Sequence, residues 1–299
     1  MGLCDGRVAV VTGAGRGLGR AHALALAAEG ARVVVNDVGV SLTGDGGDDT
    51  PARAVVDEIV AAGGEAMDDH HDVSDMDGAA AMIDAALERW GRLDTLVCNA
   101  GIVRDRMLVN MTVDEWDAVM RVHLRGTFCP VRRAIDHWRA EAKQGRDPEA
   151  RIVTTSSGAG LFGSVSQANY SAAKGAIASF TVVAAAELAR YGVRVNGIAP
   201  SARSRMTEVA FADMMQRPES GFDAMDPANV SPLVVWLGSR DCDVTGRMFE
   251  IAGGQLSVAD GWQHGAVHDE GGRFVPSEVG DVVRRLVAEA PVPAPVYGA

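Results

Sequence analysis

The chain has 299 residues, of which 47% are hydrophobic, a length and composition that suit one large α/β domain with a full core. Its net charge of −12 argues against nucleic-acid binding, which usually needs a basic face. A local basic patch that binds a phosphate group is still compatible with this overall charge.

The cysteines and the N-terminal segment indicate the compartment. Cys4, Cys98, Cys129 and Cys242 have no CxxC spacing, so reduced thiols are expected rather than a disulfide framework. The N-terminus enters an apolar run at once, without the basic region and cleavage site of a signal peptide. No stretch reaches the roughly 18–20 apolar residues that span a bilayer. We therefore expect a soluble, cytoplasmic protein with no membrane partner.

The N-terminal segment predicts a strand, a helix and a second strand. Val8–Thr12 is a short apolar run, a helical pattern follows it to about Glu29, and Arg32–Asn36 is the second strand. A βαβ unit of this kind implies parallel strands joined by a right-handed crossover.

The loop after the first strand carries Gly13, Gly17 and Gly19, spaced G-x-x-x-G-x-G. Glycines let the backbone approach a pyrophosphate, and the helix N-terminus behind them offers free N–H groups and a positive dipole. Because this loop lies between a strand and a helix, we interpret it as a dinucleotide-binding loop that also contains Arg16 and Leu18.

Asp37 closes the second strand. A carboxylate there accepts hydrogen bonds from the adenosine ribose and repels a 2′-phosphate, which favours NAD. The alternative is a strand-ending turn aspartate. Arg16 is a counter-signal because a loop arginine can meet a 2′-phosphate, but Val38 occupies the place where a basic residue would better support NADP. The predicted cofactor is NAD, with NADP less favoured.

The next stretch is a polar, glycine-rich loop over Val40–Ala52, followed by a helix over about 52–62 and a third strand near Glu65–His71. The cluster DDHHD, Asp68–Asp72, has the composition of a metal site. We interpret it as the end of the third strand and predict no metal. A helix over Asp75–Trp90 leads to the fourth strand.

The fourth strand, Thr95–Asn99, ends in the segment CNAG, and small residues there let the chain approach a cofactor. Val103–Asn110 is expected to be a loop near the substrate mouth. Thr112–Phe128 and Pro130–Lys143 are predicted to be long helical segments.

Three residues around the fifth strand, Ile152–Ser156, suggest proton-transfer chemistry. Tyr170 and Lys174 are four residues apart and share one face of a helix, and Ser157 precedes the tyrosine by 13 residues. A nearby ammonium favours the phenolate and brings its pKa from about 10 toward working pH. The serine hydroxyl would hold the substrate oxygen. Alone, the pattern also fits an amphipathic helix with a surface lysine.

Together, the glycine loop, CNAG and the Ser157, Tyr170 and Lys174 set resemble the classical branch of the short-chain dehydrogenase/reductase family, from about Arg7 to about Gly254. The resemblance implies a single-domain, Rossmann-like, doubly wound parallel α/β sheet of about seven strands with helices on both faces. It places Asp72 against the adenine and Thr207 on the nicotinamide carboxamide. The implied cofactor-binding residues are Gly13, Arg16, Gly17, Leu18, Gly19, Asp37, Asp72, Val73, Asn99, Ala100, Gly101, Tyr170, Lys174, Pro200 and Thr207.

His123 departs from the common family pattern. Classical members usually have an asparagine at this place, which supports a water that links the lysine to solvent. A histidine can also hold a water or relay a proton, so we expect His123 to be the fourth catalytic residue. The alternative is a structural histidine in the helix.

The segments VHLRGTF, QANYSAAK and SRMT resemble a narrower group, the (3R)-hydroxyacyl-CoA dehydrogenase unit of peroxisomal multifunctional enzyme type 2, also called 17β-hydroxysteroid dehydrogenase type 4. We expect a stand-alone bacterial relative that interconverts a (3R)-hydroxyacyl-CoA and its 3-oxoacyl-CoA with NAD. The enzymatic alternatives are an NADPH-dependent 3-oxoacyl-thioester reductase and a hydroxysteroid dehydrogenase. A non-enzymatic alternative is a dinucleotide-sensing regulatory protein.

The expected domain organisation is a Rossmann domain over 1–260 and a C-terminal extension over 261–299, packed on the same domain, with one helix near Pro276–Ala290. Pliable apolar residues over about 207–227 suit a substrate lid, although packing of a small helix pair explains them equally well. In many family members the two long helical segments pair between subunits, so a homodimer or homotetramer is expected. The pliable residues are Phe211, Met214, Met215 and Phe222.

Overall fold

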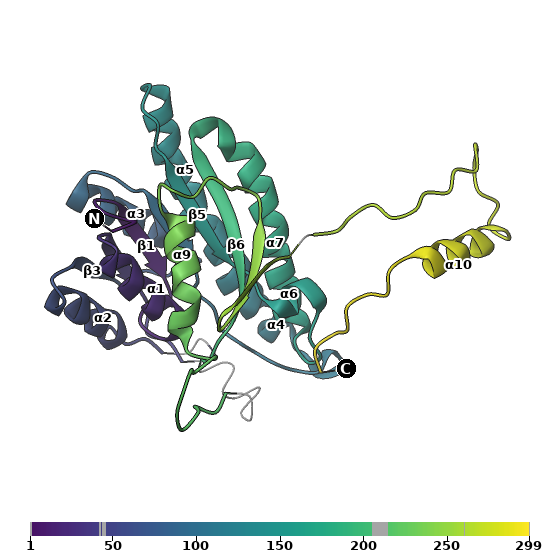
Figure 1. The fold of residues 1–299 in the computed structure, drawn as a ribbon, viewed down its shortest axis with the longest axis horizontal. Coiled ribbons are helices and arrows are strands. Elements are labelled where there is room, and N and C mark those ends of the chain that lie inside the picture. Colours follow the sequence, from purple (N-terminus) through teal and green to yellow (C-terminus); the bar gives the residue numbers. More distant parts are fainter. Residues whose placement is uncertain (1, 42, 44–45, 205–214, 260, 299) are drawn as a thin grey trace.

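The computed structural model describes residues 2–41, 43, 46–204, 215–259 and 261–298. Within them, the centre of the fold is one eight-stranded sheet in the order β3-β2-β1-β4-β5-β6-β7-β8 (Figure 1). Neighbouring strands are parallel except for β8, which runs antiparallel to β7. The strands are β1 Val8–Thr12, β2 Arg32–Asn36, β3 Glu65–Asp69, β4 Thr95–Cys98, β5 Ala150–Thr155, β6 Val193–Ser201, β7 Met248–Ala252 and β8 Gln255–Val258.

Helices cover both faces of this sheet, which confirms the predicted doubly wound α/β fold. Helices α1, α2 and α9 pack on one face, and α3, α5 and α7 pack on the other. The helices are α1 Gly17–Ala28, α2 Thr50–Ala61, α3 Met76–Trp90, α4 Val113–Met120, α5 Gly126–Lys143, α6 Gly158–Phe162, α7 Ala168–Leu188, α9 Ser231–Gly238 and α10 Val279–Glu289.

The pattern of β1 explains this arrangement. All five of its residues are buried, because a parallel strand in the middle of such a sheet has helices on both sides. Ala9 and Val11 face the α1 side, whereas Val8 and Val10 face the α3 side. The chain leaves β1 for β2 on one side and later reaches β4 on the other, so the strand order reverses there. A crevice outside the carboxyl ends of β1 and β4 is the usual ligand site of such sheets.

The segment between α4 and α5 differs from the two separate helices that the sequence predicts. A capping box between Thr112 and Glu115 begins α4, and a π-helical turn, Arg121–Arg125, joins it to α5 without a break. Pro130 lies inside α5. Single π turns are frequent at functional sites, and this one carries His123.

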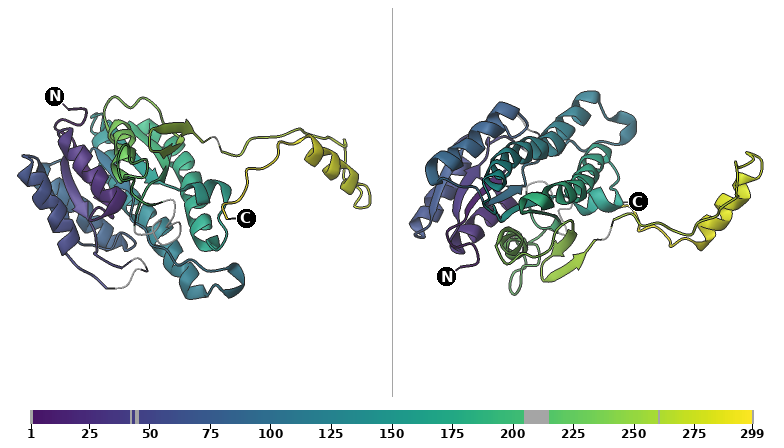
Figure 2. Two further views of the ribbon diagram at one scale, coloured as in Figure 1. Left: turned by 60° about the horizontal axis from the view of Figure 1, so that its bottom comes forward. Right: turned by 90° about the horizontal axis from the view of Figure 1, so that it is seen from above.

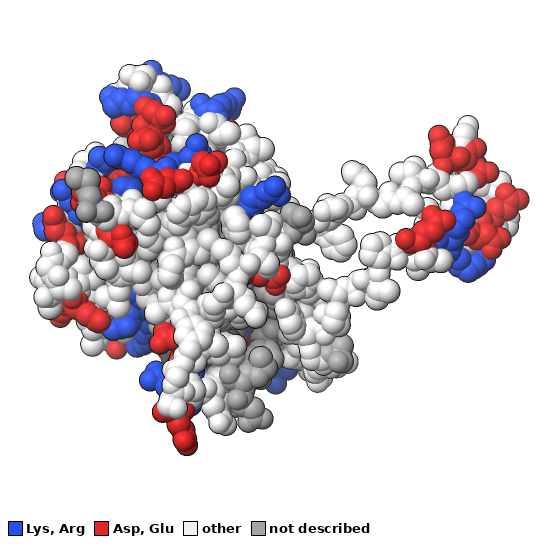
Figure 3. Space-filling model, in the orientation of Figure 1, with Lys and Arg blue, Asp and Glu red and all other residues white. Residues whose placement is uncertain are grey.

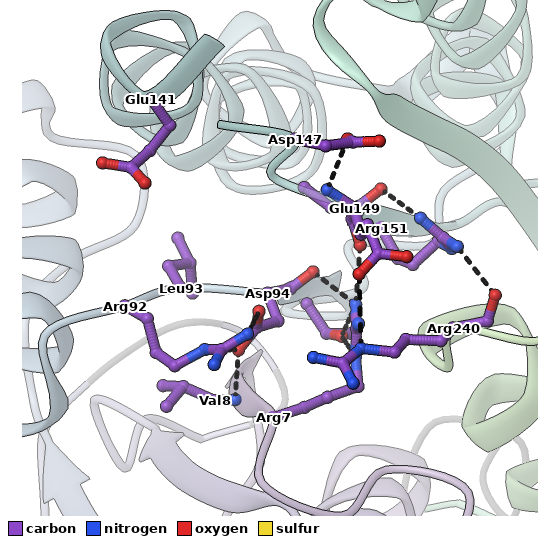
Figure 4. Close-up of polar contacts among 12 residues, drawn as sticks. Arg7, Val8, Arg92, Leu93, Asp94, Glu141, Asp147, Glu149, Arg151 and Arg240 are labelled. Atoms are coloured by element: carbon purple, nitrogen blue, oxygen red, sulfur yellow. Dashed lines mark hydrogen bonds and ion pairs between the residues drawn. The ribbon is translucent and has the colours of Figure 1, made fainter. Parts of the chain in front are cut away.

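A buried polar network ties together the amino ends of β1, β4 and β5 (Figure 4). The guanidinium of Arg7, 1% exposed, donates to the backbone oxygens of Asp94 at 2.9 Å and Glu149 at 3.1 Å. Burial lowers the pKa of Arg7 to about 10, and the charge of Asp94 opposes this effect. Arg151 extends the network by donating to the backbone oxygen of Arg240 at 3.0 Å. The carboxylate of Asp94 is also buried, and its negative charge lies near the Arg7 guanidinium.

Replacing Asp94 by alanine is expected to lower the free energy of unfolding by about 2–3 kcal/mol. The change removes acceptors from the backbone N–H of Val8, at 2.7 Å, and from the Arg92 guanidinium, at 2.6 and 2.8 Å. Urea unfolding measures the loss. Asp136→Ala is the matched control, because Asp136 pairs with Arg132 on an exposed helix surface and should change stability by less than about 1 kcal/mol. Equal effects of the two substitutions would contradict the expectation that the buried Asp94 carboxylate stabilises the fold more than the exposed Asp136–Arg132 pair does.

Helix α7 with the turn that follows it, Ala168–Tyr191, is the one described helix long and apolar enough to cross a membrane by length and composition. It packs against β5 and β6 and against α4 and α6. Its apolar character therefore fits a core helix of this domain.

The C-terminal extension forms an arm that leaves the domain after β8 and returns to it near the C-terminus (Figures 1 and 2). The sequence predicts an extension packed on the domain with a helix near its end. The helix is present as α10, but it buries no residue and lies away from the sheet. Its charges are of both signs, as they are on the face of the domain in Figure 3.

Candidate functional site

A cavity of about 380 Å³ opens at the carboxyl ends of β1, β2 and β4. This is the crevice that the strand order predicts. The structure brings ten of the expected cofactor-binding residues together in its lining. They are Gly13, Arg16, Gly17, Leu18, Asp37, Asp72, Val73, Asn99, Ala100 and Gly101.

The glycine loop is shaped by close backbone approach. Gly13 has φ +63°, and a Cβ atom on it would lie 2.7 Å from the Cα of Ala100. A Cβ atom on Gly19 would collide with the backbone oxygen of Gly13, so Gly19 lets α1 begin directly beneath the loop. Larger residues at either position would push the loop away from the backbone against which it packs. The N-terminus of α1, from Gly17, faces the cavity.

Asp37 is held in one orientation at the β2 end of the cavity. Its carboxylate accepts hydrogen bonds from the backbone N–H of Gly15, at 2.8 Å, and of Gly39, at 2.7 Å. Val38 also lines the cavity, and so does Arg16. The same cavity is thus lined by Asp37, which favours NAD, and by Arg16, which is the counter-signal in favour of NADP.

Asp72 lies at the rim beside Arg121. Its carboxylate accepts from the N–H and hydroxyl of Ser74, at 2.8 and 2.7 Å, and pairs with Arg121 at 2.9 Å. Partial burial acts to raise the pKa of Asp72, but the Ser74 hydrogen bonds and the Arg121 charge outweigh it, so the pKa is lowered. Asn99 is also bound within the chain, because its side chain donates to the backbone oxygens of Thr12 and Gly13.

The expected catalytic residues meet at the start of α6 and α7. Ser157 caps α6, and its hydroxyl accepts from the N–H of Ala159 at 3.2 Å. Lys174 is 3% exposed, and its ammonium donates to the backbone oxygen of Thr155 at 2.6 Å. That ammonium lies 5.7 Å from the ring centre of Tyr170. The helical spacing therefore places the tyrosine and the lysine together, as the sequence predicts.

Burial controls the ionisation of this pair. It raises the pKa of Tyr170 to about 12, a hydrogen bond with Ser157 opposes the shift, and the charge of Asp105 adds to it. Burial also lowers the pKa of Lys174 to about 7. The sequence interpretation expected the lysine to lower the phenol pKa. In the folded chain, burial outweighs the hydrogen bond with Ser157, so the pKa of the phenol is raised.

His123 is buried and packs against Tyr170, with the two rings edge to face at 5.2 Å between centres. Its Nε2 lies 2.7 Å from the backbone oxygen and 3.1 Å from the backbone nitrogen of Ile102. Burial lowers the pKa of His123 to about 3, and the charge of Lys174 adds to this effect, so the ring is neutral. A Cβ atom on Gly101 would collide with this ring. His123 thus contacts the tyrosine as a neutral packed side chain whose Nδ1 has no hydrogen-bond partner within the described chain.

The remaining predicted residues either lie outside the cavity lining or fall outside the described residues. Pro200 lies in β6 and does not line the cavity. Thr207, Phe211 and Met214, with most of the first half of the expected lid, fall outside the described residues. Met215 is buried and Phe222 is 66% exposed, so these two residues are not packed alike.

The other residues of the cavity lining are not among the predicted cofactor-binding residues. Four of them, Asn36, Val38, His71 and Ile102, adjoin a predicted cofactor-binding residue, and that adjacency is the signal that could have found them. Arg121 and Val122 come instead from the π turn, which the sequence pattern does not specify. The additional lining residues are Asn36, Val38, Val40, Ser41, Gly46, His71, Ile102, Arg121, Val122 and Ser204.

The DDHHD cluster is divided among separate hydrogen bonds. Asp69 accepts from Asn36 and lies 2.8 Å from His71, while His70 lies 2.8 Å from Asp68. Across the described ranges, no group of three or more His, Cys, Asp or Glu is arranged to hold a metal ion.

An open parallel sheet with a glycine loop at its switch point, and serine, tyrosine and lysine on the adjoining elements, defines the class of dinucleotide-binding α/β oxidoreductases. The chain belongs to the short-chain dehydrogenase family, whose model matches residues 7–214.

Named relatives narrow the comparison. Hydroxyacyl-CoA dehydrogenase ChsB1 of Mycobacterium tuberculosis is 46% identical over 261 residues, which is 85% of this chain and 80% of that protein. Mouse peroxisomal multifunctional enzyme type 2 is 42% identical over 84% of this chain, and the chain spans 32% of that enzyme's length. A crystal structure of a short chain dehydrogenase from Mycobacterium avium is similar over 100% of both chains, with a TM-score of 0.90 and 57% identity.

Proposed function

We propose that this protein is an NAD-dependent oxidoreductase that interconverts a (3R)-hydroxyacyl-CoA and its 3-oxoacyl-CoA. The observation that carries the cofactor choice is the fixed carboxylate of Asp37 in the cavity, next to the apolar Val38. The substrate class rests on a relative whose name includes hydroxyacyl-CoA dehydrogenase.

The residues present fit a nicotinamide dinucleotide. The backbone at Gly13 and the N-terminus of α1 suit the pyrophosphate, and Asp37 suits the adenosine ribose. Asn99, Ala100 and Gly101 line the end nearest β4. When bound, the nicotinamide supplies the hydride acceptor or donor.

The chain itself moves the proton and holds the oxygen. The Tyr170 phenol exchanges the proton of the substrate oxygen, and the Ser157 hydroxyl donates a hydrogen bond to that oxygen. Lys174 places a titratable cation 5.7 Å from the ring centre of this tyrosine. The protein contributes alignment and electrostatics to the reaction.

Asp37→Asn is expected to weaken NAD(H) binding by about tenfold and to leave NADP(H) binding unchanged or stronger, because it removes the charge that repels a 2′-phosphate. Titration of both cofactors, with turnover of a short 3-oxoacyl-CoA, measures this. Asp77→Asn, at an exposed position in the first turn of α3, is the control. A wild type that prefers NADP(H) would contradict the NAD assignment, and one that binds NADH without turning over the 3-oxoacyl-CoA would contradict the substrate assignment.

A second candidate is an NADPH-dependent 3-oxoacyl-thioester reductase. Arg16 favours it, because its side chain lines the same cavity and can meet a 2′-phosphate. A 3-oxoacyl-[acyl-carrier-protein] reductase of Synechocystis is 38% identical over 84% of this chain. Arg16→Ala separates the candidates, because it lowers NADPH affinity more than NADH affinity if the arginine selects the cofactor.

We further propose a cytoplasmic homodimer or homotetramer that binds neither nucleic acid nor membrane. Phe128 on α5 and Val182 and Val183 on α7 are 44–52% exposed, which supports burial of these helices between subunits. Lysine and arginine are interspersed with acidic residues on the face in Figure 3.

A further inference from the structure

The returning end of the C-terminal arm binds the loop that joins α6 to α7. The N–H of Val165 donates to the backbone oxygen of Tyr297 at 2.9 Å, and the N–H of Tyr297 donates to Gly163 at 3.2 Å. Ser164 and Tyr297 form a parallel β-bridge. The arm thus pairs with this loop through a single β-bridge.

Side chains extend this contact toward Ser157. The ring of Tyr297 lies edge to face against Phe162, with 6.5 Å between centres. A Cβ atom on Gly158, the residue after Ser157, would lie 2.8 Å from the Tyr297 hydroxyl oxygen. Burial raises the pKa of Tyr297, and the charge of Glu250 adds to it, so this phenol is neutral. The ring therefore covers the first turn of α6 beside the catalytic serine.

The same loop is held from its other side. The N–H of Arg106 donates to Ser166 at 2.7 Å, and Gln167 donates to the Asp105 carboxylate at 3.0 Å. Ser166 has φ +64°, which is uncommon for a residue other than glycine and persists when neighbouring structure enforces it. The loop connects Ser157 to Tyr170 and lies between the Arg106 segment and the arm.

The arm makes its return contact here. Helix α10 buries no residue, and Figures 1 and 2 show the arm extending away from the domain before residues 296–298 meet it. Val296 lies 3.4 Å from the Cβ position of Gly163, and Val165 lies 3.7 Å from that of Gly298. None of the residues from Ser157 to Tyr170 lines the cofactor cavity. The arm therefore contacts the segment between Ser157 and Tyr170, outside the lining of the cofactor cavity.

We propose that Val296–Gly298 is a positioning segment that holds the loop of residues 163–167, and through it the spacing of Ser157 and Tyr170, for the acyl part of the substrate. This inference rests on the proposed function. Tyr297 acts through the loop and the first turn of α6, so its loss changes substrate binding and leaves the cofactor cavity intact.

Tyr297→Ala and a chain that ends at Pro295 are expected to raise KM for the 3-oxoacyl-CoA by about tenfold, the size expected when one aromatic contact is lost, with cofactor Kd unchanged. Tyr297→Phe keeps the ring and the backbone bonds, so it should retain wild-type KM. Val292→Ala is the matched control, because Val292 is 92% exposed on the same arm. A KM within twofold of the wild type in both disruptive variants would overturn the proposal. An equal change in cofactor Kd would also overturn it.

Hydrogen exchange tests docking without a substrate. The Val165 amide should be protected in the full chain and should exchange faster in the chain ending at Pro295, because its acceptor is Tyr297. Equal exchange in both chains overturns the inference. If the wild type turns over no 3-oxoacyl-CoA, the proposed function fails on its own, and the KM series is run on any secondary alcohol that the wild type oxidises.

Discussion

Tyr170→Phe is expected to lower kcat by about 10³-fold in both directions of the reaction and to leave cofactor affinity unchanged. The phenol is the proposed proton-transfer group and lies beside Ser157, whereas the ring packs against His123. Phenylalanine keeps the ring and removes the oxygen, so the substitution tests the proton transfer separately from the packing.

Steady-state kinetics with NADH and a 3-oxoacyl-CoA measures the effect, and cofactor titration measures binding. Tyr191→Phe is the matched control, because the Tyr191 ring lies against Arg139 and Arg190 at the far end of α7. Full turnover by the Tyr170 variant would rule out the proposed mechanism. Loss of cofactor binding in that variant would show that the phenol oxygen also holds the cofactor, and it would contradict a role in proton transfer alone.

Much of this site can be predicted from sequence because parallel strands end at one edge of the sheet. Gly13, Asp37 and Asn99 each follow a buried strand, so the fold brings them to one cavity although they are distant in the chain. Tyr170 and Lys174 meet because helical spacing alone puts them on one face. Local patterns therefore specify that the expected cofactor-binding residues meet in one cavity and that the expected catalytic pair meets on one helix face.

Other features depend on contacts that no local pattern encodes. β8 exists because Gln255–Val258 turns back on β7, which gives an eighth strand where about seven were expected. Tyr297 reaches the α6–α7 loop across the whole arm, and no sequence signal marks that contact. The sequence also does not reveal how deeply each side chain is buried. Burial raises the pKa of Tyr170 even though a lysine lies nearby.

Lys174→Met is expected to stabilise the protein at pH 6 by about 2 kcal/mol while lowering kcat by about 10²-fold or more. Burial lowers the pKa of Lys174 from 10.5 to about 7. Between these values the unfolded chain binds more protons than the folded chain, so wild-type stability rises with pH across that window. The cost of burying the charge is thus complete below pH 7 and absent above about pH 10.5. Methionine avoids this cost, and the lost bond to Thr155 offsets part of the gain.

Urea unfolding of the wild type and the Lys174 variant at pH 6 and at pH 10 checks the sign, because the advantage of the variant should shrink at the higher pH. Lys143→Met is the matched control, since the chain's other lysine is exposed at the end of α5 and should show no such trend. A variant less stable than the wild type at pH 6 would contradict the burial argument. A gain in stability together with a loss of turnover would mean that the fold bears the cost of burying this lysine because the reaction requires a cation beside Tyr170.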